Sequence, residues 1–171
     1  MNGVVVGPKE NKLGIRGSDT HSIMFTDVKI PKQNRVGEDG FGFKFAMKTL
    51  AGGRIGIASQ ALGIAQASLE ASIKYSKKRI QFGKPIASNQ AIQFKIADMA
   101  MEIEAARLLV RKAAMAKDQK QNYGHLASMA KVYASEVAMR ASTQCVQIHG
   151  GFGYMRESGI AVSYTHLTLP T

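Results

Sequence analysis

Apolar residues recur at helical spacing through most of the chain between Phe41 and Ile148. Alternating steps of four and three residues place them on one face of a helix, as in helices packed into a bundle. Three such stretches follow one another, with small residues at their seams. We therefore predict a mainly α fold. Three long helices of an up-and-down four-helix bundle follow a short β remnant, and the fourth helix is expected outside this sequence.

One of the three apolar stripes includes a charged residue. The first contains Arg54, and a guanidinium on an apolar stripe needs a buried partner or a ligand, or has to reach solvent. Gly52 and Gly53 just before it would let another group come close. Ser88 or Asn89 offers an N-cap for the second helix. The stripes are Phe43, Met47, Leu50, Arg54, Ile57, Ala61, Ile64, Ser68, Ala71 and Tyr75; Ile92, Ile96, Met99, Ile103, Ala106, Val110 and Ala113; and Ala127, Ala130, Ala134, Val137, Ala141, Gln144 and Ile148.

The first 37 residues have a β pattern. A β-branched run at Val4–Val6 is ended by Gly7-Pro8, and residues 22–30 alternate loosely before Pro31. Two short strands do not form a stable sheet alone, so we expect the chain to begin partway through a larger β unit. The predicted organisation is the end of a β domain at 1–37, an incomplete helical domain at 38–161, and a suspected non-native tail at 162–171, which has no helical period and resembles a translated adapter read.

Two connecting segments carry residue types that suit a ligand. In the segment from Arg79 to Ile86, Arg79, Gln81 and Phe82 supply a charge, an amide and an aromatic face, which suits a nucleotide or flavin; a plain helix connector is the alternative. The second segment runs from Gln147 to Tyr154 and contains three glycines in four positions. It could cradle a phosphate, but it closes a helix, so a helix stop is favoured.

The formal charge is +11, from 23 Lys and Arg against 12 Asp and Glu. Such a charge suits nucleic acid or another polyanion, so a free-standing basic helical module that binds nucleic acid or a partner protein is the alternative hypothesis. The basic residues are scattered, however, and a solvated helix face explains them. No membrane span is expected. The four histidines lack partners at ligand spacing, so no metal is expected, and the single cysteine fits a reducing compartment.

Five segments, in order, resemble the acyl-CoA dehydrogenases, nearest the short-chain (butyryl-CoA) branch. They span nearly everything from Lys12 to Glu157. The matching strings are LGIRGS at 13–18, DVKIP at 27–31, GRIGIA at 53–58, RIQFG at 79–83 and QIHGGFGY at 147–154.

The resemblance implies an FAD enzyme that converts a short-chain acyl-CoA to the enoyl-CoA. Members of this family are usually homotetramers that pass electrons to an electron-transfer flavoprotein. The related oxidases share the architecture but reoxidise the reduced flavin in a different way. The implied location is cytoplasmic, or the mitochondrial matrix in a eukaryote. The residues expected at a neighbouring subunit's FAD are Arg79, Gln81, Phe82, Gln90, Gln147, Ile148, His149, Gly150 and Gly151.

By the same resemblance, Gly52, Gly53 and Arg54 lie on the substrate side. The family often has an acidic residue three positions before that arginine, where this chain has Ala51. A carboxylate must remove the proton next to the thioester carbonyl. One branch of the family places it just before the arginine, where this chain has Gly53, and the other places it after the third helix of the bundle. None of the seven glutamates fits either position, so no catalytic base is assigned, and we expect it beyond this sequence.

Overall fold

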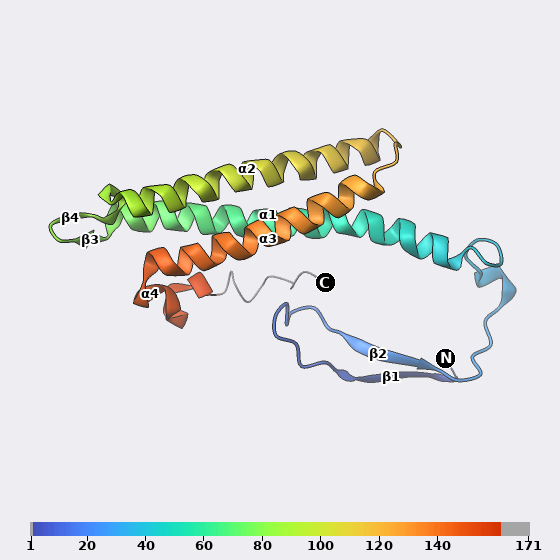
Figure 1. The fold of residues 1–171 in the computed structure, drawn as a ribbon. Helices are drawn as coiled ribbons and strands as arrows, with labels where there is room; N and C mark the ends of the chain where they lie inside the picture. The colour runs from blue at the N-terminus through green and yellow to red at the C-terminus, as the bar shows by residue number, and fades with distance from the viewer. Residues whose placement is uncertain (1, 162–171) are drawn as a thin grey trace.

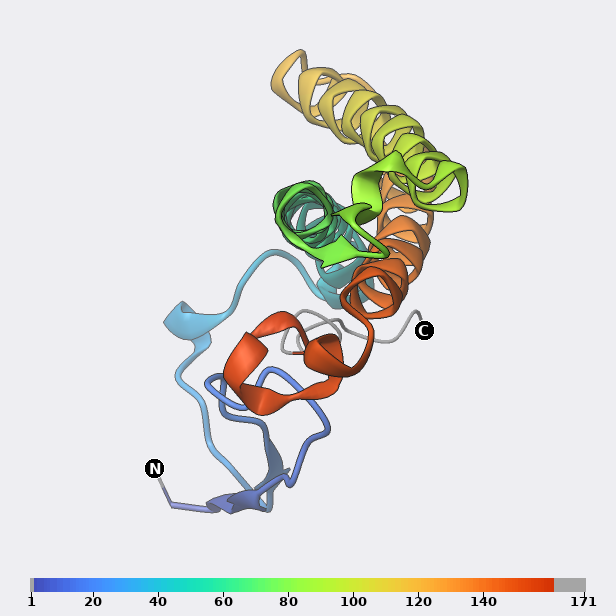
Figure 2. The same ribbon diagram turned by 90° about the vertical axis from the view of Figure 1, so that its left-hand side faces the viewer.

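Three long helices form the body of the molecule in a computed structural model that describes residues 2–161 (Figure 1). They are α1 (Gly42–Lys78), α2 (Gln90–Asp118) and α3 (Gly124–His149), of 37, 29 and 26 residues. Each runs antiparallel to the one before it. The end-on view in Figure 2 places α2 on the side of the bundle away from the N-terminal strands. The prediction of a mainly α chain with three long helices is confirmed.

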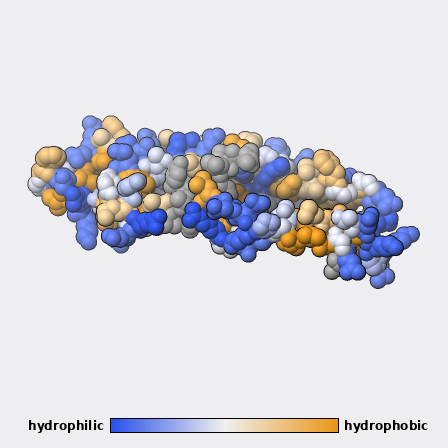
Figure 3. All heavy atoms as spheres, turned by 90° about the horizontal axis from the view of Figure 1, so that it is seen from below, coloured by the Kyte–Doolittle hydropathy of each residue, from blue (hydrophilic) through white to orange (hydrophobic). Residues whose placement is uncertain are grey.

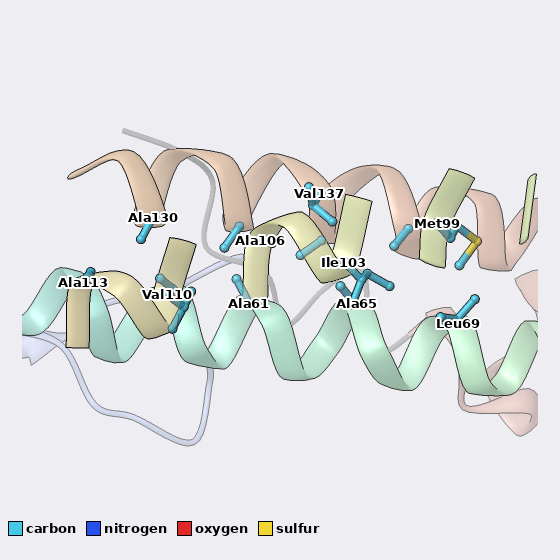
Figure 4. Close-up of a cluster of buried hydrophobic side chains, with 14 of the residues drawn as sticks. Ala61, Ala65, Leu69, Met99, Ile103, Ala106, Val110, Ala113, Ala130 and Val137 are labelled. Atoms are coloured by element: carbon cyan, nitrogen blue, oxygen red, sulfur yellow. The ribbon is translucent and has the colours of Figure 1, made fainter. Parts of the chain in front are cut away.

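The core between these helices consists mostly of alanine (Figure 4). Within residues 2–161, eleven of the eighteen buried hydrophobic residues are alanine. Methyl side chains let helix axes approach closely, and the larger Ile103 and Val137 fill the remaining space. The buried alanines are Ala58, Ala61, Ala65, Ala106, Ala113, Ala116, Ala127, Ala130, Ala134, Ala138 and Ala141.

Buried serines continue the small-residue seam along α1. The hydroxyl of Ser68 donates to the carbonyl of Ile64 at 2.9 Å, and that of Ser72 donates to the carbonyl of Ser68 at 2.7 Å. Ser76 donates in the same way to Ile73 at 3.1 Å. Because each of these hydroxyls donates to a carbonyl of its own helix, they can be buried without a cost in unsatisfied donors.

The predicted stripes are right for α2 and α3 and partly wrong for α1. On α2 the positions from Met99 to Ala113 are buried as predicted, and Asn89 is the N-cap residue, although its side chain makes no cap hydrogen bond. In the C-terminal half of α1, several buried residues lie one position after the residues predicted to be buried. The first three turns are exposed, with Phe43 76% exposed, because no described segment covers them.

The N-terminal strands form a separate antiparallel hairpin. Strand β1 (Val4–Lys9) pairs with β2 (His21–Phe25), with Val4 opposite Phe25 and an irregular register after Val6. The predicted end of the first strand at Gly7-Pro8 was wrong, because the strand continues through this irregularity to Lys9. The second strand ends at Phe25, earlier than predicted, since Asp27 has a left-handed φ of 50°.

Short elements connect and follow the helices. They are η1 (Lys32–Asn34), β3 (Ile80–Gln81), β4 (Lys84–Pro85), η2 (Ile86–Ser88), α4 (Gly151–Tyr154) and η3 (Arg156–Ser158). Figure 3 shows hydrophobic residues interspersed with hydrophilic ones on the face seen from below. No helix within residues 2–161 is long and apolar enough to cross a membrane. The suspected tail at 162–171 lies outside the described residues.

Candidate functional site

A surface groove of about 880 Å³ lies where the C-terminal ends of α1 and α3 meet. Its walls come from segments far apart in the sequence: the last turn of α1 with the β3–β4 connection, and the end of α3 with the start of α4 (Figure 2). The two connecting segments singled out by their sequence therefore form one site. The lining residues are Tyr75, Lys78, Arg79, Ile80, Gln81, Ile86, Ile148, His149, Gly150, Gly151 and Phe152.

The β3–β4 connection is a two-residue hairpin with Phe82 and Gly83 at its tip. Both have left-handed backbone, with φ values of 52° and 79°, as a type I′ turn requires. Glycine adopts a positive φ without steric strain, whereas an aromatic residue rarely adopts this conformation. The Phe82 side chain is 99% exposed. The turn thus holds an aromatic ring in solvent at the tip, beyond the residues that line the groove.

The glycine cluster ends α3, as the helix-stop interpretation predicts. Gly150 is the C-cap residue with φ 59°, and its N–H donates to the carbonyl of Gln147 at 3.1 Å. A Cβ atom added at Gly150 or Gly151 would meet nothing within 4 Å, so both backbones are open to an incoming group. Gly153 differs, because a Cβ there would lie 2.7 Å from the carbonyl oxygen of Val146. The first two glycines leave space, and the third permits close packing.

An aromatic stack joins the two walls of the groove. The ring of Tyr75 lies 4.2 Å from that of His149 and 6.1 Å from that of Phe152, centroid to centroid, with interplanar angles of 28° and 5°. His149 is only 6% exposed, and its Nδ1 lies 2.8 Å from the Cys145 carbonyl oxygen. Since a carbonyl can only accept, Nδ1 carries the proton and the ring orientation is fixed.

Sequence reasoning did not single out Tyr75 as a site residue. The sequence offered one indication that Tyr75 belongs to the site: it lies one helical turn before Arg79, and the glycine-rich segment contains two further aromatic rings. Behind the stack, burial raises the pKa of the Cys145 thiol, while a hydrogen bond with Ser72 acts in the opposite direction. A buried thiol with a raised pKa is a packing residue and a poor nucleophile.

The groove carries positive charge. Lys78 and Arg79 line it, and neither forms a salt bridge within residues 2–161. No lining residue is acidic. Cations, the Gln81 amide, open glycine backbone and an aromatic ring together fit a phosphate-bearing ligand with a planar group, such as a nucleotide. Within the described residues no cluster of candidate metal ligands is found.

The predicted substrate-side residues lie elsewhere. Arg54 lies in α1, 25 positions before Arg79, which caps the end of that helix; this corresponds to roughly 37 Å along the helix axis. Gly52 faces the α2–α3 turn, where a Cβ would lie 3.4 Å from Lys117 Nζ, whereas Gly53 faces open space. Arg54 is half-buried and forms no salt bridge with any described residue.

The remaining predicted residues, Phe82, Gln90 and Gln147, do not line the groove. Gln90 is the exposed first residue of α2, and Gln147 is exposed in the last turn of α3. None of the seven glutamates lines the groove. Glu104 instead pairs with Arg107 of the same helix at 2.9 Å, and Arg107 also donates to Gln66 of α1 at 2.8 Å.

Comparison with known proteins gives consistent matches. The family model described as "Acyl-CoA dehydrogenase, C-terminal domain" matches residues 40–169. The short-chain specific acyl-CoA dehydrogenase of Megasphaera elsdenii is 54% identical over 159 residues, which are 93% of this chain and 42% of the relative. The caffeyl-CoA reductase-Etf complex subunit CarC of Acetobacterium woodii is 52% identical over 95% of this chain and 43% of its own length.

A solved structure agrees with these matches. The butyryl-CoA dehydrogenase structure from Megasphaera elsdenii superposes with a TM-score of 0.93 at 52% identity, and the match covers 96% of this chain and 43% of that one. The chain thus spans about two fifths of the length of the relatives it matches.

Proposed function

Because the chain belongs to the acyl-CoA dehydrogenase family of oxidoreductases, we propose that it supplies the C-terminal helical part of an enzyme acting on a short-chain acyl-CoA. The reaction is α,β-dehydrogenation of the thioester to the enoyl-CoA. The names of the short-chain specific and butyryl-CoA relatives support this substrate class. Residues 1–37 would belong to the middle β domain and residues 38–161 to the helical domain.

We further infer that the groove binds the nucleotide half of FAD. The observation that carries this inference is that Arg79 and the open backbone at Gly150–Gly151, from two distant segments, line one positively charged groove. Arg79 and Lys78 would hold phosphate oxygens, and Gln81 would donate its amide. When bound, FAD supplies the acceptor for the hydride removed from the substrate.

Three predicted residues outside the groove have a place in this proposal. Phe82, at the exposed tip of the β3–β4 turn, and Gln90 and Gln147, at neighbouring helix ends, would contact the part of the cofactor that extends out of the groove. Since these groups are presented outward, they suit a cofactor held chiefly by another subunit. A neighbouring subunit in a homotetramer is the proposed holder.

The separation along α1 supports two different roles within one chain. Gly52, Gly53 and Arg54 are proposed to face the acyl-CoA of one active site, and the groove about 37 Å away would serve another. The enzyme is proposed to pass its electrons to an electron-transfer flavoprotein, in line with the name of the relative from the caffeyl-CoA reductase-Etf complex. Its proposed location is the cytoplasm, or the mitochondrial matrix in a eukaryote.

Calorimetric titration of the chain with ADP tests the groove directly, because ADP carries the phosphates and the planar ring of the nucleotide half. A charge-assisted hydrogen bond contributes about 1.5–3 kcal/mol, so Arg79→Ala should weaken ADP binding roughly 10- to 100-fold. Arg54→Ala is the matched control, since it removes an arginine of α1 that lies far from the groove and should leave ADP binding unchanged.

Equal ADP affinity in Arg79→Ala and the unchanged chain would reject the groove. Tight, salt-sensitive binding of a DNA or RNA oligonucleotide would instead favour a basic nucleic-acid-binding module. The enzymatic proposal is tested by comparing two proteins. The 171-residue chain should be colourless and inactive on butyryl-CoA, whereas the product of the full reading frame should be yellow and active.

A further inference from the structure

His149 is a buried polar residue in the wall of the groove, and one of its ring nitrogens has no partner among the described residues. The side chain is 6% exposed. Its Nδ1 donates to the Cys145 carbonyl oxygen at 2.8 Å, and the Cys145 Sγ lies 3.7 Å from the same nitrogen. Nε2 forms no hydrogen bond with any residue among 2–161. The neutral ring therefore has an unused hydrogen-bond acceptor at Nε2.

This acceptor faces the groove. In the described part of the chain, no side-chain nitrogen or oxygen is both buried and unpaired. Since Nε2 is unpaired there, it must reach the surface, and the surface that His149 lines is the groove. The stack against Tyr75, at 4.2 Å, and the hydrogen bond of Nδ1 prevent the ring from turning Nε2 away. Nε2 is thus a fixed acceptor in a groove whose charged lining residues, Lys78 and Arg79, are donors only.

The two walls of the groove suit different parts of a nucleotide. Lys78 and Arg79 on the α1 wall suit phosphate oxygens. An acceptor such as Nε2 repels a phosphate oxygen, because both carry lone pairs, and it needs an N–H or O–H of the ligand. Phe152 on the same wall as His149 is 48% exposed, so its ring has free surface against which a base can stack. The phosphates therefore belong on the α1 wall and the nucleoside on the wall of His149.

A nucleoside has two kinds of donor for such an acceptor. One is the N–H of an exocyclic amine on the base, as in adenine, and the other is the O–H of a ribose hydroxyl. A base that carries a carbonyl in place of the amine presents a second acceptor to Nε2 and leaves both groups unpaired. Because an unpaired polar group in a largely buried position costs free energy, the acceptor at Nε2 can discriminate between ligands that differ by one donor.

We propose that His149 determines which nucleotides the groove accepts, by accepting a hydrogen bond at Nε2 from the exocyclic amine or a ribose hydroxyl of the ligand. His149 is then a specificity-determining residue, and it fixes the orientation of the ligand with its phosphates toward Lys78 and Arg79. The inference rests on the proposed nucleotide site and adds to it the group that selects the nucleoside.

Calorimetric titration of the chain with ADP and three analogues tests this selection, at about pH 8.5, where an imidazole side chain is ordinarily neutral. The 2′-deoxy and 3′-deoxy forms of ADP each lack one ribose hydroxyl, and purine riboside diphosphate lacks the exocyclic amine. The net contribution of a neutral hydrogen bond corresponds to about a 3- to 10-fold change in affinity, so one analogue should bind that much more weakly than ADP. Loss with the purine analogue identifies the amine as the donor, and loss with a deoxy form identifies the hydroxyl.

Two substitutions at His149 show whether Nε2 is the source of the preference. His149→Phe keeps a ring against Tyr75 but has no acceptor, so ADP and the weaker analogue should bind equally. His149→Gln can place an amide oxygen near the position of Nε2 and should recover part of the preference. His125→Phe is the matched control, because His125 is exposed in the first turn of the same helix, at its other end, and the preference should be unchanged. Circular dichroism verifies that each variant keeps its helices.

Failure of this inference differs from failure of the groove. Equal binding of ADP and all three analogues to the unchanged chain would overturn the role of His149 while leaving the nucleotide site in place, and this result needs no variant to fold. A preference for ADP that persists in His149→Phe would overturn it in the same way. Absence of ADP binding by the unchanged chain would instead reject the nucleotide site, and the selection by His149 with it.

Discussion

The two ends of α1 are built differently, although one continuous helix carries both. At the Arg79 end, two distant segments close on each other through the Tyr75–His149–Phe152 stack and form both walls of a charged groove. At the Arg54 end, Gly53 faces open space and the first turns are exposed. The described residues therefore form a groove at one end and leave the other end largely exposed, so the two ends should respond differently to substitution.

Replacing Ile103 with alanine should have the largest effect, because it damages the core on which both ends depend. Ile103 is 1% exposed, and a buried Ile→Ala change costs about 2–5 kcal/mol of unfolding free energy. Urea unfolding followed by circular dichroism measures the loss. Leu108→Ala on the exposed side of the same helix should cost under about 0.5 kcal/mol. Comparable losses in the two variants would contradict the observed core.

Gly153→Ala should damage the Arg79 end alone. The added methyl would lie 2.7 Å from the Val146 carbonyl oxygen and 2.8 Å from His149 Cβ, so the turn that carries the glycines must move. Overpacking of this kind costs about 1–3 kcal/mol. Thermal unfolding should show a lower midpoint. Gly151→Ala, whose methyl meets nothing within 4 Å, provides the matched comparison and should unfold near the original temperature.

Tyr75→Leu keeps an apolar side chain of similar reach but removes the stack that holds the groove walls together. Aromatic pairs contribute about 0.5–1.5 kcal/mol beyond the area they bury, so we expect a loss of that size and weaker ADP binding. Tyr154→Leu is the control, because Tyr154 is exposed and takes no part in the stack. If Tyr75→Leu binds ADP normally, the stack does not shape the groove.

Gly53→Ala should have the smallest effect and the opposite sign. Its position inside a helix facing open space means that alanine fits and removes the entropic cost of glycine, a gain of about 0.5–1 kcal/mol. A slightly higher thermal midpoint is expected. In the full-length enzyme the same change should raise KM for butyryl-CoA if Gly53 permits close approach of the substrate. Destabilisation would show that the Arg54 end is less open than it is in this structure.

The helices of this fold could be predicted because their pattern is local. The stripes of α2 and α3, the helix stop at Gly150 and the Glu104–Arg107 pair all follow from spacing within one helix. The stripe of α1 was misjudged at its start because periodicity shows that a face is apolar but not which segment covers it. Phe43 follows the pattern and is nevertheless exposed.

The groove was foreseen only in parts. Arg79 and the glycines at Gly150–Gly151 were singled out separately by residue type, and the resemblance placed both at the nucleotide. Their meeting depends on the antiparallel return of α3 along α1, which no local pattern encodes. The contribution of Tyr75 is invisible for the same reason, since its stacking partner His149 lies 74 positions away in the chain.

The alanine-rich core has a consequence for the thermodynamics of unfolding. A buried methyl side chain removes much less apolar surface from water than a buried leucine does. Both the heat-capacity change of unfolding and the denaturant dependence scale with the surface that unfolding exposes. The helical body should therefore have a flatter stability curve and a broader denaturant transition than a leucine-packed bundle of equal length, and its stability should change less steeply with temperature.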